Sequence, residues 1–371
     1  MKKKVIFSLL LAGCCLLAGC AQTSADEDVF SKGESPAVQQ TEAQPSETAP
    51  ESEALPTQEQ QPSSAPAGDG PVYIDQVTMG EDVELLDELI PLSTSPAAAP
   101  AMLVPVASGT AVKTGGGAEI DYSNVKDGYV MVRFAAANSK QLRVQVKGPT
   151  GTTYTYVLPT GSWVTFPLSD GNGSYKVTAL QNSTGNKYSV LASASFQVTL
   201  ADEFAPFLRP NQYVNYDGAV NTVTKAAQLM GNISDPLKKV EVVYDFVVKN
   251  LTYDTQRAAA VSSGKLSSYL PVLDSVLAER KGICFDYAAL MTGMLRSQGV
   301  PCKLVVGYAG TVYHAWVSVW TEETGWVDGV IYFDGTTWQR MDPTFASSGN
   351  SSESIMKFIG NGSNYKVKYL Y

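Results

Sequence analysis

The segment 272–342 constrains the fold most, because a helical pattern in it gives way to short strand-like runs. The helical spacing covers 284–297 and is stopped by Gly299 and Pro301. After this stop, β-branched and aromatic residues alternate with polar ones, which predicts antiparallel strands. The expected strands are 302–308, 314–320, 325–327, 330–333 and 337–342. Helices followed by antiparallel strands predict an α+β domain, to which we assign residues 205–371.

A second helix is expected upstream in this domain. Asp235-Pro236 has the form of an N-cap followed by proline at the first helical position. Apolar residues then recur every three or four positions, which predicts one buried stripe. They are Leu237, Val240, Tyr244, Val247 and Leu251. This helix should end near Asn250, and a loop rich in serine and glycine should lead to a helical segment at 272–278.

The stretch 106–204 has a different texture, dominated by Gly, Thr, Ser, Tyr and Val. Six or seven short alternating runs separated by glycine-rich turns predict an all-β, sandwich-like module. The expected strands are 129–134, 142–146, 154–158, 162–166, 174–178 and 195–200. No candidate catalytic set lies inside the module. A spacer or packing platform is therefore favoured over a dedicated binding module.

Residues 1–20 have the pattern of an export signal. Three lysines precede a short apolar stretch that ends in Leu17-Ala-Gly-Cys20. The ending resembles a bacterial lipobox, which predicts that Cys20 is lipidated (with chains such as palmitate) after cleavage. Cys14 closes a similar sequence, but it would leave too short an apolar region. An ordinary cleaved signal peptide is the alternative. The prediction is export and lipid anchoring to the outer face of the cytoplasmic membrane, or to the outer membrane where the cell has one.

Residues 21–105 are expected to form a disordered tether. Ser, Pro, Glu, Gln and Ala dominate its first fifty residues, and such a composition cannot bury enough apolar surface to fold. The negative charge of the chain belongs to this region: residues 21–100 hold sixteen acidic residues and one lysine. The remainder, 101–371, carries a formal charge of only +3. Its lysines and arginines are not clustered, so no nucleic-acid partner is predicted.

Five cysteines and one histidine limit the possible metal and disulfide chemistry. Only Cys284 and Cys302 lie beyond the N-terminal segment, which is too few for a disulfide framework. With a single histidine and no Cys-x-x-Cys pair, a zinc site has too few soft ligands, and no calcium-binding loop is visible. No cofactor and no metal is predicted. The oligomeric state is left open.

Three residues of the C-terminal domain form a candidate catalytic set: Cys284, His314 and Asp342. A thiol at a helix N-terminus faces unpaired N–H groups and the positive end of the helix dipole, which favour the thiolate. The same N–H groups can hold an oxyanion. His314, on a following strand, can accept the thiol proton, and Asp342, on the next, can orient the imidazole ring. Taken singly, each residue is more often structural; their joint occurrence in this order favours nucleophilic catalysis.

These motifs resemble the transglutaminase-like superfamily, the papain-type thiol fold, in a bacterial lipoprotein form. The resemblance covers about 218–346 and rests on four sets of residues. They are Lys281-Gly-Ile-Cys-Phe-Asp-Tyr-Ala288, the stretch 295–308, His314-Ala-Trp316 with Gly325-Trp326, and Asp342-Pro-Thr344. It implies that Cys284 is the nucleophile, His314 the base and Asp342 the orienting carboxylate. It also implies acyl transfer on a protein or peptide substrate outside the cell, through a cysteine thioester.

Several alternatives remain open at this point. The thioester can pass to an amine, giving transamidation, or to water, giving hydrolysis as a protease or amidase. A disulfide between Cys284 and Cys302 would silence the site. Tyr253 is a candidate for a second oxyanion donor by analogy only. The competing hypothesis for the whole chain is a non-catalytic surface or cell-wall-associated binding protein that retains the fold.

Overall fold

The computed structural model describes residues 101–371, apart from 267, 323–324, 329–331, 334–337 and 340–364. The predicted signal peptide, the lipidation site Cys20 and the tether up to residue 100 lie outside the described residues. Among the helices that are described, none combines the length and apolarity needed to span a bilayer. The α+β class with a β-rich N-terminal part is confirmed.

The β-rich part consists of two four-stranded sheets, β1-β2-β3-β6 and β5-β4-β7-β8, in which all pairs are antiparallel. Strands of one sheet contact strands of the other, and their inward side chains form the core. The strand bounds are β1 (Val112–Gly115), β2 (Ala118–Asp121), β3 (Tyr129–Phe134), β4 (Leu142–Lys147), β5 (Thr153–Val157), β6 (Val164–Pro167), β7 (Gly173–Thr184) and β8 (Lys187–Val198). In β4, the buried Leu142, Val144 and Val146 alternate with more exposed residues, as the sequence pattern predicts.

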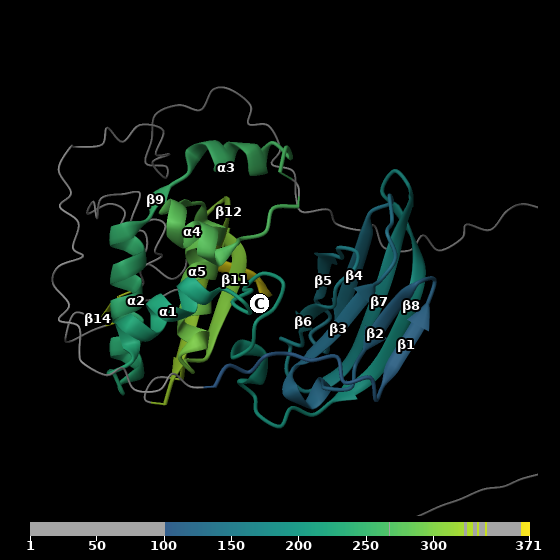
Figure 1. The fold of residues 1–371 in the computed structure, drawn as a ribbon, viewed down its shortest axis with the longest axis horizontal. Helices are drawn as coiled ribbons and strands as arrows, with labels where there is room; N and C mark the ends of the chain where they lie inside the picture. The colour runs from purple at the N-terminus through teal and green to yellow at the C-terminus, as the bar shows by residue number, and fades with distance from the viewer. Residues whose placement is uncertain (1–100, 267, 323–324, 329–331, 334–337, 340–364) are drawn as a thin grey trace, which may run out of the picture. The chain divides into compact units, whose positions relative to one another are not determined.

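The C-terminal domain is built around one helix, α5 (Cys284–Ser297), and the expected helix at this position is confirmed. Every residue from Asp286 to Ser297 is buried, because α1, α2, α4 and the strands β11 and β12 all contact this helix. Figure 1 shows α1, α2 and α4 gathered beside α5. Their bounds are α1 (Val220–Met230), α2 (Pro236–Asn250) and α4 (Leu273–Glu279). A helix buried on all sides carries apolar residues around its whole circumference.

The N-terminus of α2 forms as its sequence predicts. The Asp235 side chain accepts a hydrogen bond of 2.8 Å from the Leu237 N–H, and Pro236 occupies the first helical position. The stripe residues Val240, Tyr244 and Val247 are buried. The segment after α2 differs from expectation: part of the expected loop is the helix α3 (Thr255–Ser262). None of its residues is buried, so no apolar period marks it.

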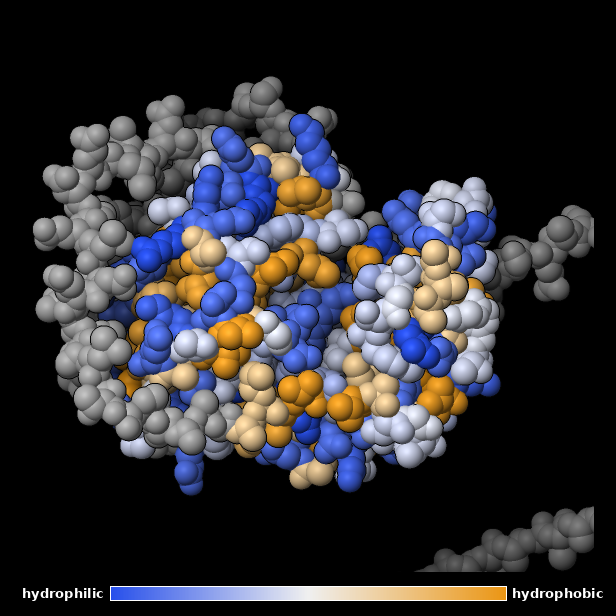
Figure 2. Space-filling view, in the orientation of Figure 1, coloured by the Kyte–Doolittle hydropathy of each residue, from blue (hydrophilic) through white to orange (hydrophobic). Residues whose placement is uncertain are grey.

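A sheet in the order β13-β12-β11-β16 packs against α5. The bounds are β11 (Cys302–Ala309), β12 (Val312–Thr321), β13 (Gly325–Asp328) and β16 (Tyr365–Leu370). The hairpin β14 (Tyr332–Phe333) and β15 (Trp338–Gln339) follows β13 along the chain. The antiparallel pairing predicted for the run after 302 is confirmed, whereas β16 was not expected. On the face shown in Figure 2, hydrophobic and hydrophilic residues are interspersed.

Gly307→Ala is expected to destabilise this sheet by about 2–3 kcal/mol, because overpacking against main chain cannot be relieved by a rotamer change. A Cβ at Gly307 would lie 2.0 Å from the Lys366 main-chain oxygen on β16 and 2.8 Å from the Trp316 ring. Urea unfolding followed by circular dichroism measures the loss. Gly293→Ala is the matched control, because its Cβ would meet only the tip of the Leu273 side chain within 3 Å. Equal effects of the two substitutions would contradict this account.

Candidate active site

Cys284 is the first residue of α5 and is a free, partly exposed thiol. Ile283 has an extended backbone and is the N-cap residue, although its side chain has no polar atom with which to cap the helix. In the described part of the chain, the N–H groups of Cys284 and Phe285 donate no hydrogen bond, as is usual for the first turn of a helix. Open N–H groups beside a thiol can stabilise both a thiolate and an oxyanion.

The turn that leads into Cys284 is tightly built. The strands β10 (Lys281–Gly282) and β9 (Thr252–Tyr253) pair in parallel, which was not expected from the sequence. Arg280, between α4 and β10, has a left-handed φ of 51°. A Cβ at Gly282 would lie 2.5 Å from the Cβ of Asp286, so only glycine fits there without displacing the helix. Close packing on both sides of the turn therefore fixes where α5 begins.

Asp286 lies two residues after Cys284 and was missed as a site residue in the sequence. Its fully buried side chain accepts hydrogen bonds from the Ile283 N–H at 2.8 Å and from the Tyr269 hydroxyl at 2.5 Å. Burial raises the pKa of Asp286, although these two bonds and the Arg257 charge act in the opposite direction. An acidic residue at the third helical position is the available sequence signal, because it can cap its own helix.

His314 is the third residue of β12, where it pairs with Gly307 of β11. The side chain is buried, with only 5% of its surface exposed. Because side chains alternate along a strand, His314 lies on the same face of the sheet as Trp316 and Ser318. The neighbouring Tyr313 shares the other face with Val319, which pairs with Cys302. Because the thiol of Cys302 contacts the hydroxyl of Thr292 at 3.6 Å, this second face is the one that α5 covers.

The beginning of α5 and the beginning of β12 lie at the same end of this helix–sheet layer. Arg296, near the far end of α5, donates a hydrogen bond of 2.8 Å to the Cys302 carbonyl at the start of β11. The strand β11 then runs back along α5, so the β11–β12 hairpin returns to the end that holds Cys284. Burial raises the pKa of Tyr313, and the charge on Cys284 contributes to the rise, as expected for neighbouring groups.

Of the other predicted site residues, the structure describes Tyr253 but not Asp342 or Cys20. Asp342 lies outside the described residues, as does Cys20. Tyr253 pairs through its main chain with Gly282, two residues before Cys284. The contact between the Cys284 thiol and the His314 imidazole, and the catalytic role of all three residues, stay predictions. Within the described residues, no group of three or more His, Cys, Asp or Glu side chains gathers as metal ligands do.

Cys302 and Cys284 do not form the disulfide that the sequence left open, since both are free. Cys302 is fully buried beside Thr292, and burial raises the pKa of its thiol to about 12. We expect iodoacetamide at pH 8 to modify Cys284 in the native protein and to leave Cys302 unmodified, because only the thiolate reacts. Peptide mass spectrometry measures both sites, and denatured protein is the control. Equal modification of Cys302 in the native protein would contradict this assignment.

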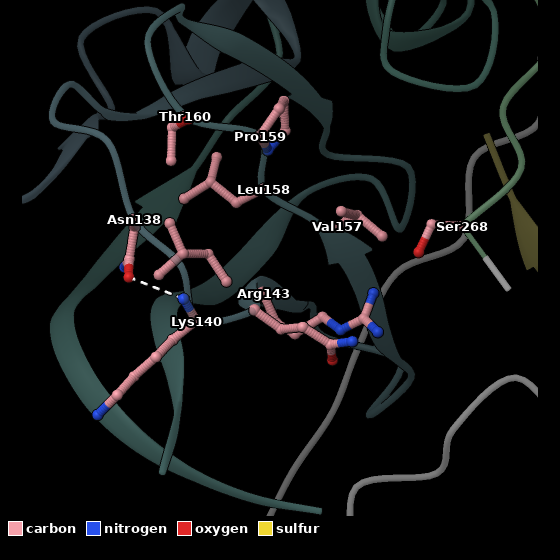
Figure 3. A pocket seen from close by; sticks show the side chains of 10 residues that line it. Asn138, Lys140, Arg143, Val157, Leu158, Pro159, Thr160 and Ser268 are labelled. Carbon is pink, nitrogen blue, oxygen red and sulfur yellow. Dashed lines mark hydrogen bonds between the residues drawn. The ribbon is translucent and has the colours of Figure 1, made fainter.

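A pocket of about 210 Å³ lies apart from these residues. It is lined by Asn138, residues 140–143 and 157–160, and Ser268, and its charged members, Lys140 and Arg143, are both cationic. Figure 3 shows its lining side chains, with the Asn138 side chain accepting a hydrogen bond of 3.0 Å from the Lys140 N–H. Neither Cys284 nor His314 lines this pocket, so the cavity is not the candidate catalytic centre.

Comparison with known proteins supports the class of the domain. Residues 223–343 match the family model of the transglutaminase-like superfamily. The chain therefore carries a transglutaminase-like domain over this range, and the resemblance seen in the motifs is confirmed. Proteins of this class are commonly cysteine peptidases or transglutaminases. The bacterial lipoprotein form stays a prediction.

Two curated relatives match parts of the chain. The uncharacterized protein YebA of Bacillus subtilis is 29% identical over 124 residues, which is 28% of this chain and 16% of that protein. A protein-glutamine gamma-glutamyltransferase of Pseudomonas aeruginosa is 34% identical over 68 residues, which is 15% of this chain and 10% of that protein. The matches thus span less than a fifth of either relative, and the activity of a whole relative does not transfer.

The comparison with solved structures found weak similarities at low sequence identity. One, described as a candidate cysteine protease of Cytophaga hutchinsonii, has a TM-score of 0.33 and 15% identity, with 70% of this chain and 78% of that chain covered. The transglutaminase of red sea bream has a TM-score of 0.25 and 13% identity, with 62% of this chain and 53% of that chain covered. At these values the likenesses carry no information about activity.

Proposed function

We propose that this protein is a thiol enzyme that transfers the acyl group of a protein or peptide amide through a thioester on Cys284. The observation that carries the proposal is the free Cys284 thiol at the first residue of the central helix. The beginning of β12, which holds His314, lies at the same end of the layer. The transglutaminase-like domain over 223–343 supports the same chemistry.

In the first half of the proposed reaction, His314 takes the proton of the Cys284 thiol. The thiolate attacks the amide carbonyl carbon, a C–S bond forms, and negative charge develops on the carbonyl oxygen. The N–H of Cys284 is placed to donate to that oxyanion, because it has no other acceptor in the described part of the chain. Collapse of the intermediate breaks the C–N bond, and the protonated imidazole gives its proton to the departing amine.

In the second half, an amine or water attacks the thioester carbonyl while His314 accepts a proton from it. The C–S bond breaks and the thiol is restored with that proton. An amine acceptor gives a new amide, and water gives a carboxylate. Asp342 would orient the imidazole through a hydrogen bond to its other ring nitrogen. The thiol and the imidazole would meet at the end of the layer where α5 and β12 both begin.

We further propose that the enzyme works outside the cell on a lipid anchor at Cys20, with residues 21–105 as the tether. The lysines and the apolar run before Leu17-Ala-Gly-Cys20 support this location. Cys20→Ala should release the protein from the membrane fraction, as measured by fractionation and immunoblotting.

The reaction is tested with glutamine-bearing peptides, with and without a primary amine, followed by mass spectrometry. An amine adduct of the peptide identifies transamidation, whereas a gain of one mass unit or a cleaved peptide identifies deamidation or proteolysis. Under reducing conditions, an amide-derived electrophile should form an adduct with Cys284. The proposal fails if neither a product nor this adduct appears.

A non-catalytic surface binding protein is the second candidate. The observation that favours it is the alternation of β12, which gives His314 the face of Trp316 rather than the face that α5 covers. Absence of any Cys284 adduct, together with retained binding of cell-wall material by Cys284→Ala, would favour this candidate.

A further inference from the structure

The carboxylate of Asp286 is buried in the first turn of α5, two residues after the predicted nucleophile, and a cation from another helix lies beside this carboxylate. Nη1 of Arg257 is 3.4 Å from Oδ2 of Asp286. The same guanidinium nitrogen donates a hydrogen bond of 3.1 Å to the Tyr269 hydroxyl, which in turn donates to Asp286. Arg257 lies on α3 and Tyr269 on the segment between α3 and α4. Two elements remote in sequence thus converge on the first turn of α5.

Arg257 is held in place by further acidic groups. Its Nη2 is 2.8 Å from the Glu279 carboxylate at the end of α4, and its Nε is 3.5 Å from the Asp254 carboxylate. Asp254 also accepts a hydrogen bond of 2.9 Å from the Arg257 N–H and caps α3. The Arg257 side chain is 20% exposed, so it remains charged and only partly screened. The cation therefore has a fixed position relative to Asp286.

An uncompensated carboxylate at this place would oppose the chemistry of Cys284. Both side chains leave the first turn of α5, and a nearby negative charge disfavours a second one. Other charged or titratable groups around this turn in the described residues are Lys281 on β10, Tyr253 on β9 and Tyr313 on β12. Lys281 pairs at 3.5 Å with Asp254, so its charge is engaged with a different carboxylate.

We propose that Arg257 and Tyr269 are positioning residues that act on Cys284 through Asp286. Asp286 accepts a hydrogen bond from the Ile283 N–H and so fixes the turn that precedes Cys284. Arg257 offsets the Asp286 charge, so that the positive end of α5 still favours the thiolate. The inference rests on the proposed nucleophilic role of Cys284, but its test reads the thiol itself and needs no substrate.

The test follows the rate of Cys284 alkylation by iodoacetamide across pH 5–10 in the full-length chain. Mass spectrometry of the Cys284 peptide separates it from the other four cysteines. Arg257→Gln should slow alkylation at pH 7.5 by about fivefold and move the midpoint of the pH profile upward, because the carboxylate loses its counter-ion. Arg257→Lys keeps the charge but loses the guanidinium fork, so it should alkylate faster than Arg257→Gln and no faster than wild type.

If Arg257 acts through its charge, the double variant should restore the alkylation of Cys284; if Arg257 is merely structural, the double variant should not. Asp286→Asn removes the negative charge and should move the midpoint downward, and Arg257→Gln combined with Asp286→Asn should return close to wild type. Arg133→Gln, which breaks a comparable 2.7 Å ion pair with Glu119 in the β-sandwich, is the matched control and should leave the profile unchanged. The proposal is overturned if Arg257→Gln alkylates at the wild-type rate, or if the double variant is slower than either single variant. Should Asp286→Asn not fold, the contrast between Arg257→Gln and Arg257→Lys decides alone.

The result of the alkylation test does not depend on whether the protein catalyses the proposed reaction. A wild-type protein that shows the expected alkylation series but forms no peptide product would retain the positioning role and lose the proposed function. A protein that forms product while Arg257→Gln alkylates normally would retain the function and lose the positioning role.

Discussion

Cys284→Ala is expected to abolish product formation from glutamine-bearing peptides, with a fall in kcat/KM of at least about 1,000-fold. The thiol forms the covalent bond in the proposed reaction, and alanine offers no nucleophile in its place. The remaining rate would reflect binding and the helix N–H groups only. Steady-state kinetics of the purified protein, with peptide product measured by mass spectrometry, provides the value.

Two companion variants separate the roles in this experiment. Cys302→Ala is the control, because its buried thiol lies beside Thr292 near the other end of α5 and should be dispensable for turnover. Asp342→Asn should lower kcat by about 10²–10⁴-fold if it orients the imidazole, since the amide favours the wrong tautomer. Wild-type turnover in Cys284→Ala would exclude the thioester route altogether.

Arg296→Met is expected to lower the free energy of unfolding by about 3–5 kcal/mol, because three buried hydrogen bonds from a charged donor are lost, each worth about 1.5–3 kcal/mol before the cost of burying the guanidinium is subtracted. Arg296 is 3% exposed and donates hydrogen bonds to the main-chain oxygens of Cys302, Arg209 and Tyr371, at 2.8, 2.9 and 2.6 Å. Burial lowers the pKa of this guanidinium. Methionine fills similar space but leaves three carbonyl oxygens without these donors.

Urea unfolding of wild type and variant measures this loss. Arg133→Met is a suitable control, because Arg133 lies in the β-sandwich, is 33% exposed and pairs with one glutamate. Its replacement should cost no more than about 1 kcal/mol, as is usual for exposed ion pairs. A loss below that value for Arg296→Met would show that the three bonds add little net stability. Cys284 alkylation in folded Arg296→Met should remain near the wild-type rate, since the substitution lies at the opposite end of α5.

The fold was predictable where local pattern decides structure. The cap of α2, the start of α5 at Cys284 and the run of antiparallel strands from Cys302 all follow from residues close together in sequence. The helix α3 was not predictable in this way, because none of its residues is buried and no apolar period results. The strand β16 was missed because its pairing with β11 joins segments about sixty residues apart.

The residues of the candidate site were likewise only partly predictable from the sequence. Cys284 and His314 stood out because each is rare in this chain and sits in a recognisable local context. No comparable local pattern marks Arg257 or Tyr269, which contact Asp286 from positions 29 and 17 residues earlier in the chain. Nor did it indicate that Gly307 must leave room for the main chain of β16.

By itself, the sequence determined the helix that begins at the cysteine, the strand that carries the histidine and the order of these two elements. Periodicity and capping, which decide such elements, act within a few residues. The tertiary structure decided what surrounds the thiol. It buried α5 on all sides, kept Cys302 apart from Cys284, and brought Arg257 and Tyr269 to Asp286. These outcomes depend on contacts between distant segments, which only form once the chain has packed around its central helix.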